Sequence, residues 1–190
     1  MPKTPIDRNV VPPCVQNSER WSRKKEMVSK LYWVTPETAT MPRPNGYDLL
    51  EQEIKNWHGL QINTAVSLLT TGEARELGLE QEGELCRQHG IGFIHFPIKD
   101  RQTPESHLKT KTLIDCLVSK ANNKEKIVIH CRGGIGRASI IVGALLVRLG
   151  LTAPATLQLI AQARGLRVPD TEEQARWLAD FEEKVKIARI

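Results

Sequence analysis

The sequence predicts an α/β domain with a mainly parallel central sheet and helices on both faces. Short apolar runs with strand character alternate along most of the chain with longer segments of helical character. Strands that alternate with helices form a parallel sheet whose faces the helices cover. With 190 residues, the chain can bury one sizeable core without disulfides or a structural metal. We therefore expect one domain over residues 30–190, preceded by an extension of residues 1–29.

The strands are predicted from short runs of apolar residues, many of them β-branched or aromatic. These runs cover residues 31–34, 38–41, 62–69, 91–98 and 126–130. Their length is that of strands, and the last run is apolar enough to be a buried strand.

The helices are predicted from apolar residues at helical spacing and from capping residues at their starts. They cover Asp48 to Gly59, 72–78, 80–89, Thr103 to about Lys120, 138–147, 152–164 and a last segment from Thr171. Asp48 and Glu51 have the spacing of a capping box, and Pro104 occupies a first-turn position that tolerates proline. Thr152 and Thr171 are expected to cap the last two helices.

The net charge of +5 is concentrated at the start of the chain. Residues 1–30 contain seven Lys or Arg and three Asp or Glu, which accounts for +4 of the total. We interpret residues 1–29 as a basic, proline-containing extension that is solvated, with weak contact to an acidic surface as the alternative. Aromatic residues are not interleaved with these charges, so we expect no nucleic-acid partner.

Membrane insertion and secretion are not expected. The longest apolar run, Ala138 to Val147, is too short to span a bilayer, and Met1 to Val15 contains no apolar signal segment. The four cysteines lie far apart, with no C-x-x-C pair and no zinc-ligand spacing. We therefore expect a soluble cytoplasmic protein with reduced thiols and no integral membrane segment.

The most informative stretch is the glycine-rich run His-Cys-Arg-Gly-Gly-Ile-Gly-Arg at residues 130–137. It joins the predicted strand 126–130 to the predicted helix 138–147. Backbone N–H groups converge in such a loop, and the dipole of the following helix favours negative charge. We predict a phosphate-binding loop whose members are Arg132, Gly133, Gly134, Ile135, Gly136 and Arg137.

Cys131 and Arg137 stand at the two ends of this loop. A helix N-terminus and a nearby cation stabilise a cysteine as the thiolate, which is its nucleophilic form. The planar guanidinium of Arg137 can hold two phosphate oxygens while the sulfur attacks phosphorus. His130 is expected to support the loop through a hydrogen bond and not to react itself.

The pattern His-Cys-x5-Arg, with glycines at positions 134 and 136, resembles the signature of the protein tyrosine phosphatase superfamily. The length and surroundings of the motif are most similar to the dual-specificity branch. The resemblance implies a protein tyrosine phosphatase-like fold, a phosphocysteine intermediate, and catalysis without a metal or other cofactor. A buried structural cysteine beside a turn is the alternative, and the combination of His, Cys, three Gly and Arg argues against it.

Asp100 is the predicted general acid, and we expect it to activate the water of the second step as well. Ligands of open parallel sheets bind at the carboxyl ends of strands, and Asp100 follows the strand 91–98 at the same edge as Cys131. Cleavage of a phosphate ester needs a proton for the leaving group, which a nearby carboxylic acid can deliver. The resemblance also implies an acid in a loop upstream of the cysteine. Glu105 and His107 are the alternative acids, and a turn or cap role is the alternative for Asp100.

Further polar residues are predicted to support the site. Gln174 has the spacing of a capping box with Thr171, and the resemblance implies the alternative of placing water for the second step. The residue after the signature arginine is normally Ser or Thr in the family, whereas here it is Ala138 and the hydroxyl is on Ser139. We therefore expect slow hydrolysis of the intermediate. Arg164 is expected at the surface, with contact to phosphate as the alternative.

These observations together predict a phosphate monoester hydrolase that acts on phosphotyrosine in proteins, with phosphoserine and phosphothreonine as further substrates. Phosphorylated proteins or other phosphate monoesters are thus the expected partners. A phosphatase of phosphoinositides or inositol phosphates is the alternative enzyme, and a non-catalytic phosphate-binding adaptor is the alternative from another class. Lys99, Arg101 and Arg132 are predicted to make the mouth of the cleft cationic and to favour acidic substrates.

Overall fold

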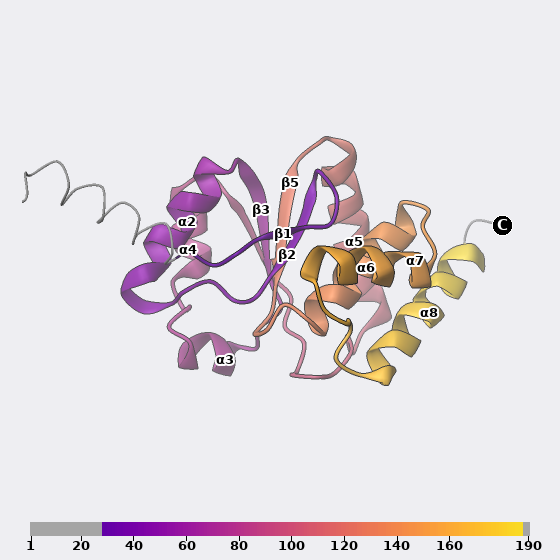
Figure 1. Cartoon of the computed structure of the whole chain (residues 1–190). Helices are drawn as coiled ribbons and strands as arrows, with labels where there is room; N and C mark the ends of the chain where they lie inside the picture. Colours follow the sequence, from indigo (N-terminus) through magenta and orange to yellow (C-terminus); the bar gives the residue numbers. More distant parts are fainter. Residues whose placement is uncertain (1–27, 188–190) are drawn as a thin grey trace, which may run out of the picture.

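The computed structural model describes residues 28–187, so the predicted N-terminal extension lies almost entirely outside the described residues. Within this range, five strands form one sheet in the order β1-β2-β5-β3-β4 (Figure 1). The strands are β1 (Tyr32–Trp33), β2 (Thr38–Met41), β3 (Ile62–Ser67), β4 (Gly92–His95) and β5 (Lys126–His130). Only β1 runs antiparallel to its neighbour, which confirms the predicted mainly parallel sheet.

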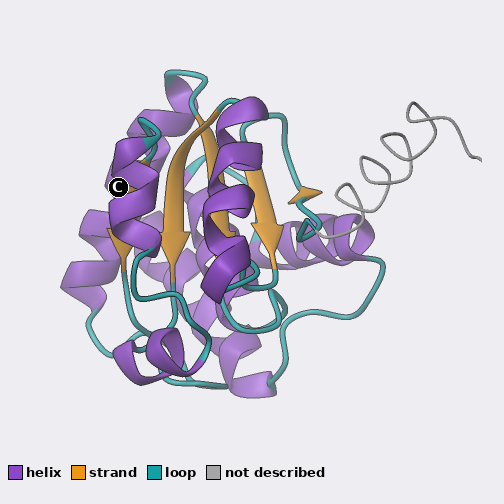
Figure 2. Ribbon diagram, turned by 90° about the vertical axis from the view of Figure 1, so that its left-hand side faces the viewer, coloured by secondary structure: helices purple, strands orange, loops and turns teal. Residues whose placement is uncertain are grey.

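Helices lie on both sides of the sheet, as predicted (Figures 1 and 2). One side carries α2 (Leu50–Gly59) and α4 (Glu82–Gln88), and the short α3 (Thr71–Glu76) lies near the ends of the strands. The other side carries α5 (His107–Asn122), α6 (Arg137–Arg148), α7 (Ala153–Arg164) and α8 (Glu172–Ile187). In Figure 2 the parallel strands point toward one common edge of the molecule, where the loops after β3, β4 and β5 meet.

The side chains of β5 alternate between two cores, one on each face of the sheet. Ile127 and Ile129 pack among residues of α5, α6 and α8, whereas Val128 packs with Trp57 and other residues on the α2 and α4 side. Residues 137–147 of α6 are all buried, as expected for a helix that is apolar on most of its surface. No helix among residues 28–187 has both the length and the apolarity that crossing a bilayer requires.

The strand predicted over residues 91–98 is shorter than expected. β4 ends at His95, because Pro97 has no N–H group to donate to a neighbouring strand. The Phe96 N–H group still donates to the carbonyl of Ser67, the last residue of β3, at 2.9 Å, and the Ile98 N–H group donates to the Leu68 carbonyl at 3.1 Å. The chain therefore remains against the sheet up to the loop that carries the predicted acid.

Two predicted helix starts are wrong. The helix expected to start at Thr103 begins at His107, because the Ser106 side chain caps it by accepting a hydrogen bond from the third helical N–H group. The capping box expected at Asp48 is not formed, since α2 begins at Leu50 and follows the 3-10 turn η1 (Tyr47–Leu49) without a side-chain cap.

Glu53, a buried residue of α2, anchors the start of the described chain. Its Oε1 accepts hydrogen bonds from Ser29 N at 2.8 Å, from Ser29 Oγ at 2.6 Å and from Asn45 Nδ2 at 2.6 Å. Ser29 is thus in contact with the domain, and the predicted division at residue 30 remains a prediction.

Candidate active site

The predicted phosphate-binding loop starts where β5 ends and stops where α6 begins. Cys131 is buried, and its Sγ accepts a hydrogen bond from the Gly134 N–H at 3.2 Å. Gly134 has a φ of +67°, and a Cβ at this position would lie 2.6 Å from Pro42 N, so the loop needs glycine here. The strand, the glycine turn and the helix N-terminus together place the thiol against a backbone donor.

Arg137 is 2% exposed, and both of its terminal nitrogens are fully engaged. Nη1 donates to Glu73 Oε2 and to the Ile98 carbonyl, both at 2.8 Å. Nη2 donates to Glu73 Oε1 at 2.9 Å and forms an ion pair with Asp100 Oδ1 at 2.8 Å. Because each terminal nitrogen carries two hydrogens, a phosphate that binds Nη2 has to take the place of Asp100.

Glu73 is a site residue that the sequence analysis missed. It forms a capping box with Thr70 at the start of α3 and a bidentate ion pair with Arg137. Burial acts to raise the pKa of Glu73, but hydrogen bonds from Arg137 and Thr70 lower it to about 2. The available signal was the Thr-x-x-Glu spacing directly after a predicted strand, at the edge where Cys131 also lies.

The same cluster keeps Arg137 positively charged. Burial acts to lower the pKa of Arg137, but the hydrogen bond to Glu73 and the charges of Cys131, Glu73 and Asp100 raise it overall. A fixed cation therefore lies beside the sulfur, which is the arrangement that stabilises a thiolate and binds a phosphate.

Of the three candidate acids, Asp100 is the one that contacts Arg137. Its side chain is 59% exposed, so it can turn toward a bound ester. Glu105 forms an exposed ion pair with Lys99 at 3.1 Å, and His107 lies 2.9 Å from the Nζ of a lysine of α8. These contacts hold both alternative acids away from Arg137 and favour Asp100.

Two of the three cations predicted at the cleft mouth are paired with glutamates. The Arg132 side chain is bound to Glu76, and Lys99 is bound to Glu105. Arg101 is exposed. These ion pairs reduce the positive charge at the cleft mouth that we expected to attract acidic substrates. The predicted role of Arg132 in the phosphate-binding loop depends on its backbone and is not affected by the pairing of its side chain.

His130, which we expected to support the loop through a hydrogen bond, binds a glutamate outside the loop, and Ser139 lies in the first turn of α6. His130 Nε2 lies 2.7 Å from Glu82 Oε1, and both side chains are buried, so this pair ties the end of β5 to the start of α4. Ser139 Oγ is buried and has no hydrogen-bond partner among residues 28–187.

Arg164 supports the loop from α7, a role that the sequence analysis did not predict. Its Nη2 donates to the Gly133 carbonyl at 2.9 Å, and its guanidinium lies 4.0 Å from the centre of the Tyr32 ring. The side chain is buried and therefore does not belong to the surface.

The capping box predicted for Gln174 is only half formed. Thr171 Oγ1 accepts a hydrogen bond from Gln174 N at 3.2 Å, as a cap residue does. The Gln174 side chain does not return this bond, because its Nε2 donates to the Gln102 carbonyl at 3.1 Å. The amide thus connects α8 to the loop that carries Asp100.

The arrangement brings a thiol, backbone donors, a buried arginine and an exposed carboxylate to one edge of the sheet. These are the parts needed to bind a phosphate group, attack it and protonate a leaving oxygen. In the described part of the chain, no three His, Cys, Asp or Glu side chains gather in a way that could hold a metal ion.

Comparison with known proteins places this site in a family. The protein family described as "Swiss Army Knife protein, DSP-PTPase phosphatase domain" (PTP-SAK) matches residues 29–184 of this chain. The chain belongs to this family of dual-specificity-like protein tyrosine phosphatases. Its signature loop, residues 130–137, falls within the matched range, and the resemblance drawn from those residues is confirmed.

A curated relative is named as a protein tyrosine phosphatase domain-containing protein, in agreement with this family. Protein tyrosine phosphatase domain-containing protein 1 of Danio rerio is 31% identical over 146 residues, which are 70% of this chain but 20% of the relative. The chain therefore spans about a fifth of that protein's length.

Solved structures share the fold of this PTP-SAK domain. A crystal structure of kinase associated phosphatase, with its catalytic cysteine replaced by serine, has a TM-score of 0.74 at 19% identity and covers 84% of this chain and 97% of its own. A crystal structure of PTPMT1 in complex with PI(5)P has a TM-score of 0.70 at 12% identity, covering 84% of this chain and 99% of its own.

Proposed function

We propose that this protein hydrolyses phosphate monoesters through a phosphocysteine intermediate, with phosphotyrosine, phosphoserine and phosphothreonine in proteins as substrates. The observation that carries the proposal is the environment of Arg137. This buried cation is held by Glu73, lies beside Cys131 and contacts Asp100. Nucleophile, phosphate ligand and proton donor are thus neighbours.

Substrate binding rearranges the contacts of Arg137 in this mechanism. The phosphate enters the loop and replaces Asp100 on Nη2, which releases the Asp100 carboxyl group toward the leaving oxygen. Cys131 Sγ attacks phosphorus, the ester P–O bond breaks, and Asp100 protonates the departing oxygen. Water then cleaves the S–P bond, which regenerates the thiolate and releases inorganic phosphate.

Two alternatives remain distinct from this proposal. The likeness to PTPMT1 concerns the fold, so a phosphoinositide phosphatase is a second enzyme class to assay. A phosphate-binding adaptor needs no nucleophile or acid, and the presence of Cys131, Arg137 and Asp100 argues against it. A reducing cytoplasmic location is part of the proposal, because Cys131 is a free thiol and has to remain one.

Turnover on matched substrates tests the function. The full chain is assayed with a phosphotyrosine peptide, the same peptide with phosphoserine, and vesicles that contain a phosphoinositide. We expect the highest kcat/KM on the phosphotyrosine peptide. Faster hydrolysis of the phosphoinositide favours the lipid enzyme, and stoichiometric binding without phosphate release favours the adaptor.

Asp100→Asn is expected to lower kcat by about 10²–10³ on esters with poor leaving groups, because such leaving oxygens need a proton. The loss on an activated nitrophenyl ester is expected to be smaller. Since asparagine does not form the ion pair with Arg137, binding of an unreactive oxyanion is expected to tighten. Stopped assays on both esters and calorimetry with phosphate measure these effects.

The matched control for Asp100 is Glu105→Gln, which removes an exposed carboxylate from the same loop. It is expected to leave kcat unchanged on both esters. Equal losses on both esters in Asp100→Asn would indicate a structural role for Asp100.

Ala138→Ser is expected to speed the steady state by about tenfold, through a charge-assisted hydrogen bond to the sulfur as the intermediate breaks down. Ala138 is fully buried and supplies no hydroxyl. The wild type is therefore expected to release a burst of leaving group in rapid mixing, followed by a slower phase. A linear progress curve from the first turnover, with no gain in the variant, would contradict this.

A further inference from the structure

The helix that carries Glu73 is not held by the core. α3 has six residues, and isolated helices shorter than about 12–15 residues are marginal in water. None of the six is buried, and Ala74 is only partly covered by the core on the α2 and α4 side. The position of α3 therefore depends on contacts at its two ends. At its start, the Thr70 side chain caps the helix by accepting a hydrogen bond from Glu73 N at 3.3 Å.

Tyr47 contacts the other end of α3 with both its side chain and its backbone. The Tyr47 hydroxyl donates to the carbonyl of Glu76, the last residue of α3, at 2.8 Å. Tyr47 N donates to the Gly78 carbonyl at 3.0 Å. The ring lies against the backbone of Gly78, since a Cβ at position 78 would be 2.6 Å from two of the ring carbons. These contacts fix the point at which α3 ends.

The backbone of Tyr47 is strained. Its φ of +53° lies in the left-handed region, which costs free energy for a residue other than glycine. Residues in such conformations are held there by their surroundings and concentrate at functional sites. The Tyr47 side chain is 71% exposed, so burial in the core does not offset the cost. The contacts with residues 76–78 are what offsets it, and they link this strained residue to α3.

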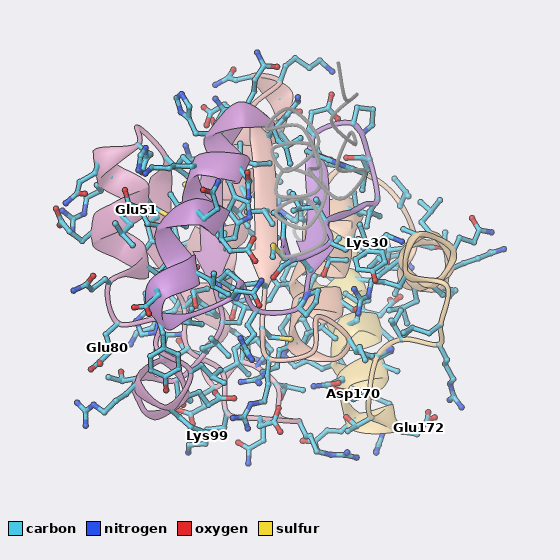
Figure 3. All side chains as sticks on the ribbon, turned by 60° about the vertical axis from the view of Figure 1, so that its left-hand side comes forward. Lys30, Glu51, Glu80, Lys99, Asp170 and Glu172 are labelled. Atoms are coloured by element: carbon cyan, nitrogen blue, oxygen red, sulfur yellow. The ribbon has the colours of Figure 1, made fainter. Side chains whose placement is uncertain are left out.

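α3 in turn holds the buried arginine of the site. Glu73 precedes Glu76 by one helical turn, and its carboxylate accepts from both terminal nitrogens of Arg137, at 2.8 and 2.9 Å. The helix lies near the ends of the strands (Figure 1). Figure 3 shows Glu80, which follows α3, and Lys99, the residue before the predicted acid, at the same end of the molecule. A displacement of α3 would therefore lengthen the bonds that keep the guanidinium in place.

We propose that Tyr47 is a positioning residue for phosphoryl transfer, which acts on Arg137 through α3 and Glu73. The inference rests on the proposed phosphatase function and extends it to the segment between β2 and α2. Tyr47 holds the end of α3, and α3 presents Glu73 to the guanidinium, which can then bind two phosphate oxygens. Without the hydroxyl of Tyr47, the last turn of α3 frays more often, and Arg137 spends less time in this geometry.

The effect of Tyr47 on the reaction differs from that of Asp100. In the proposed mechanism Arg137 binds the phosphoryl group, whereas Asp100 protonates the leaving oxygen. Loss of the Tyr47 hydroxyl is therefore expected to slow esters with good and poor leaving groups by the same factor. It is also expected to weaken the binding of inorganic phosphate, which has no leaving group.

Tyr47→Phe in the full chain tests the role of the hydroxyl and keeps the ring. It is expected to lower kcat/KM by about three- to tenfold on a nitrophenyl ester and on an alkyl ester, and to weaken binding of inorganic phosphate by a similar factor, from the net contribution of one hydrogen bond. Steady-state assays and calorimetry measure these effects. Thr112→Val is the matched control, because the exposed Thr112 hydroxyl donates to the Leu108 carbonyl of α5 at 3.1 Å. The control is expected to match the wild type.

A double-mutant cycle with Glu73→Gln tests the route through α3. If Tyr47 acts through Glu73, Tyr47→Phe changes the affinity for inorganic phosphate by less than about twofold once Glu73→Gln is present. The same loss of affinity in both backgrounds overturns the route. Unchanged kcat/KM in Tyr47→Phe, with or without a lower midpoint of urea unfolding, overturns the positioning role.

Failure of this inference is distinguishable from failure of the proposed function. A wild type that hydrolyses none of the esters overturns the proposed function. Calorimetry with inorganic phosphate requires no turnover, so the cycle still decides whether Tyr47 acts on Arg137. A wild type that turns over while Tyr47→Phe matches it overturns the inference alone.

Discussion

Replacing Cys131 with serine is expected to abolish turnover while phosphate binding survives. A serine hydroxyl is barely ionised at neutral pH, whereas the thiolate is the attacking species. The groups that bind phosphate remain, because Arg137 keeps its ion pair with Glu73 and the loop backbone is unchanged. Turnover on an aryl phosphate and calorimetry with phosphate measure the two effects. Residual turnover above about a tenth of the wild-type rate would contradict the assignment.

The other described cysteines provide controls for this substitution. Cys116 is exposed on α5, and Cys116→Ser is expected to retain full activity. Cys86 is buried in the core on the α2 and α4 side, and burial, with a smaller effect of Glu82, raises the pKa of its thiol to about 12. Cys86 is thus expected to be unreactive, so among the described cysteines alkylation at neutral pH should label Cys131 and Cys116 before Cys86.

Glu73→Gln is expected to have the second largest effect, because it removes the partner that holds Arg137. The buried guanidinium then keeps only the exposed Asp100 as a carboxylate partner, so the free energy of unfolding is expected to fall by up to about 3 kcal/mol, the lower end for breaking a buried ion pair. The displaced guanidinium is also expected to lower kcat by about 10²-fold, as small misplacements in active sites do. Urea unfolding and steady-state kinetics measure the two losses. Glu76→Gln, which affects only the exposed pair with Arg132, is the control.

The same variant tests the pH dependence of stability. The pKa of Glu73 is about 2 in the folded protein against 4.5 for an ordinary glutamate, so its ion pair stabilises the fold above pH 4.5. This contribution, about 3 kcal/mol, is lost as the pH falls from 4.5 toward 2. The free energy of unfolding of Glu73→Gln should therefore fall less steeply over this range. Parallel pH profiles for the two proteins would contradict the lowered pKa.

Much of the fold could be predicted because its signals are local. Each strand was visible as a short apolar run, and the alternation with helices was sufficient for a mainly parallel sheet. The errors lie at element ends. Pro97 shortens β4. Ser106 caps α5, so this helix begins later than the helix predicted from Thr103. One backbone group or one side chain decides where an element starts or ends.

Part of the candidate site could not be predicted, because it depends on contacts between distant segments. Glu73 and Arg137 are 64 residues apart, and Arg164 reaches Gly133 across 31 residues.

The sequence by itself determined the candidate nucleophile, the candidate phosphate-binding arginine and the glycine-rich loop. Their spacing between a strand and a helix is local, and Gly134 needs a positive φ whatever the rest of the chain does. Only the tertiary structure decided which carboxylates surround that loop. The parallel order of β5, β3 and β4 brings the segments after these strands to one edge, where Glu73 and Asp100 meet Arg137. The packing of α8 against α6 places the Gln174 side chain against Gly136.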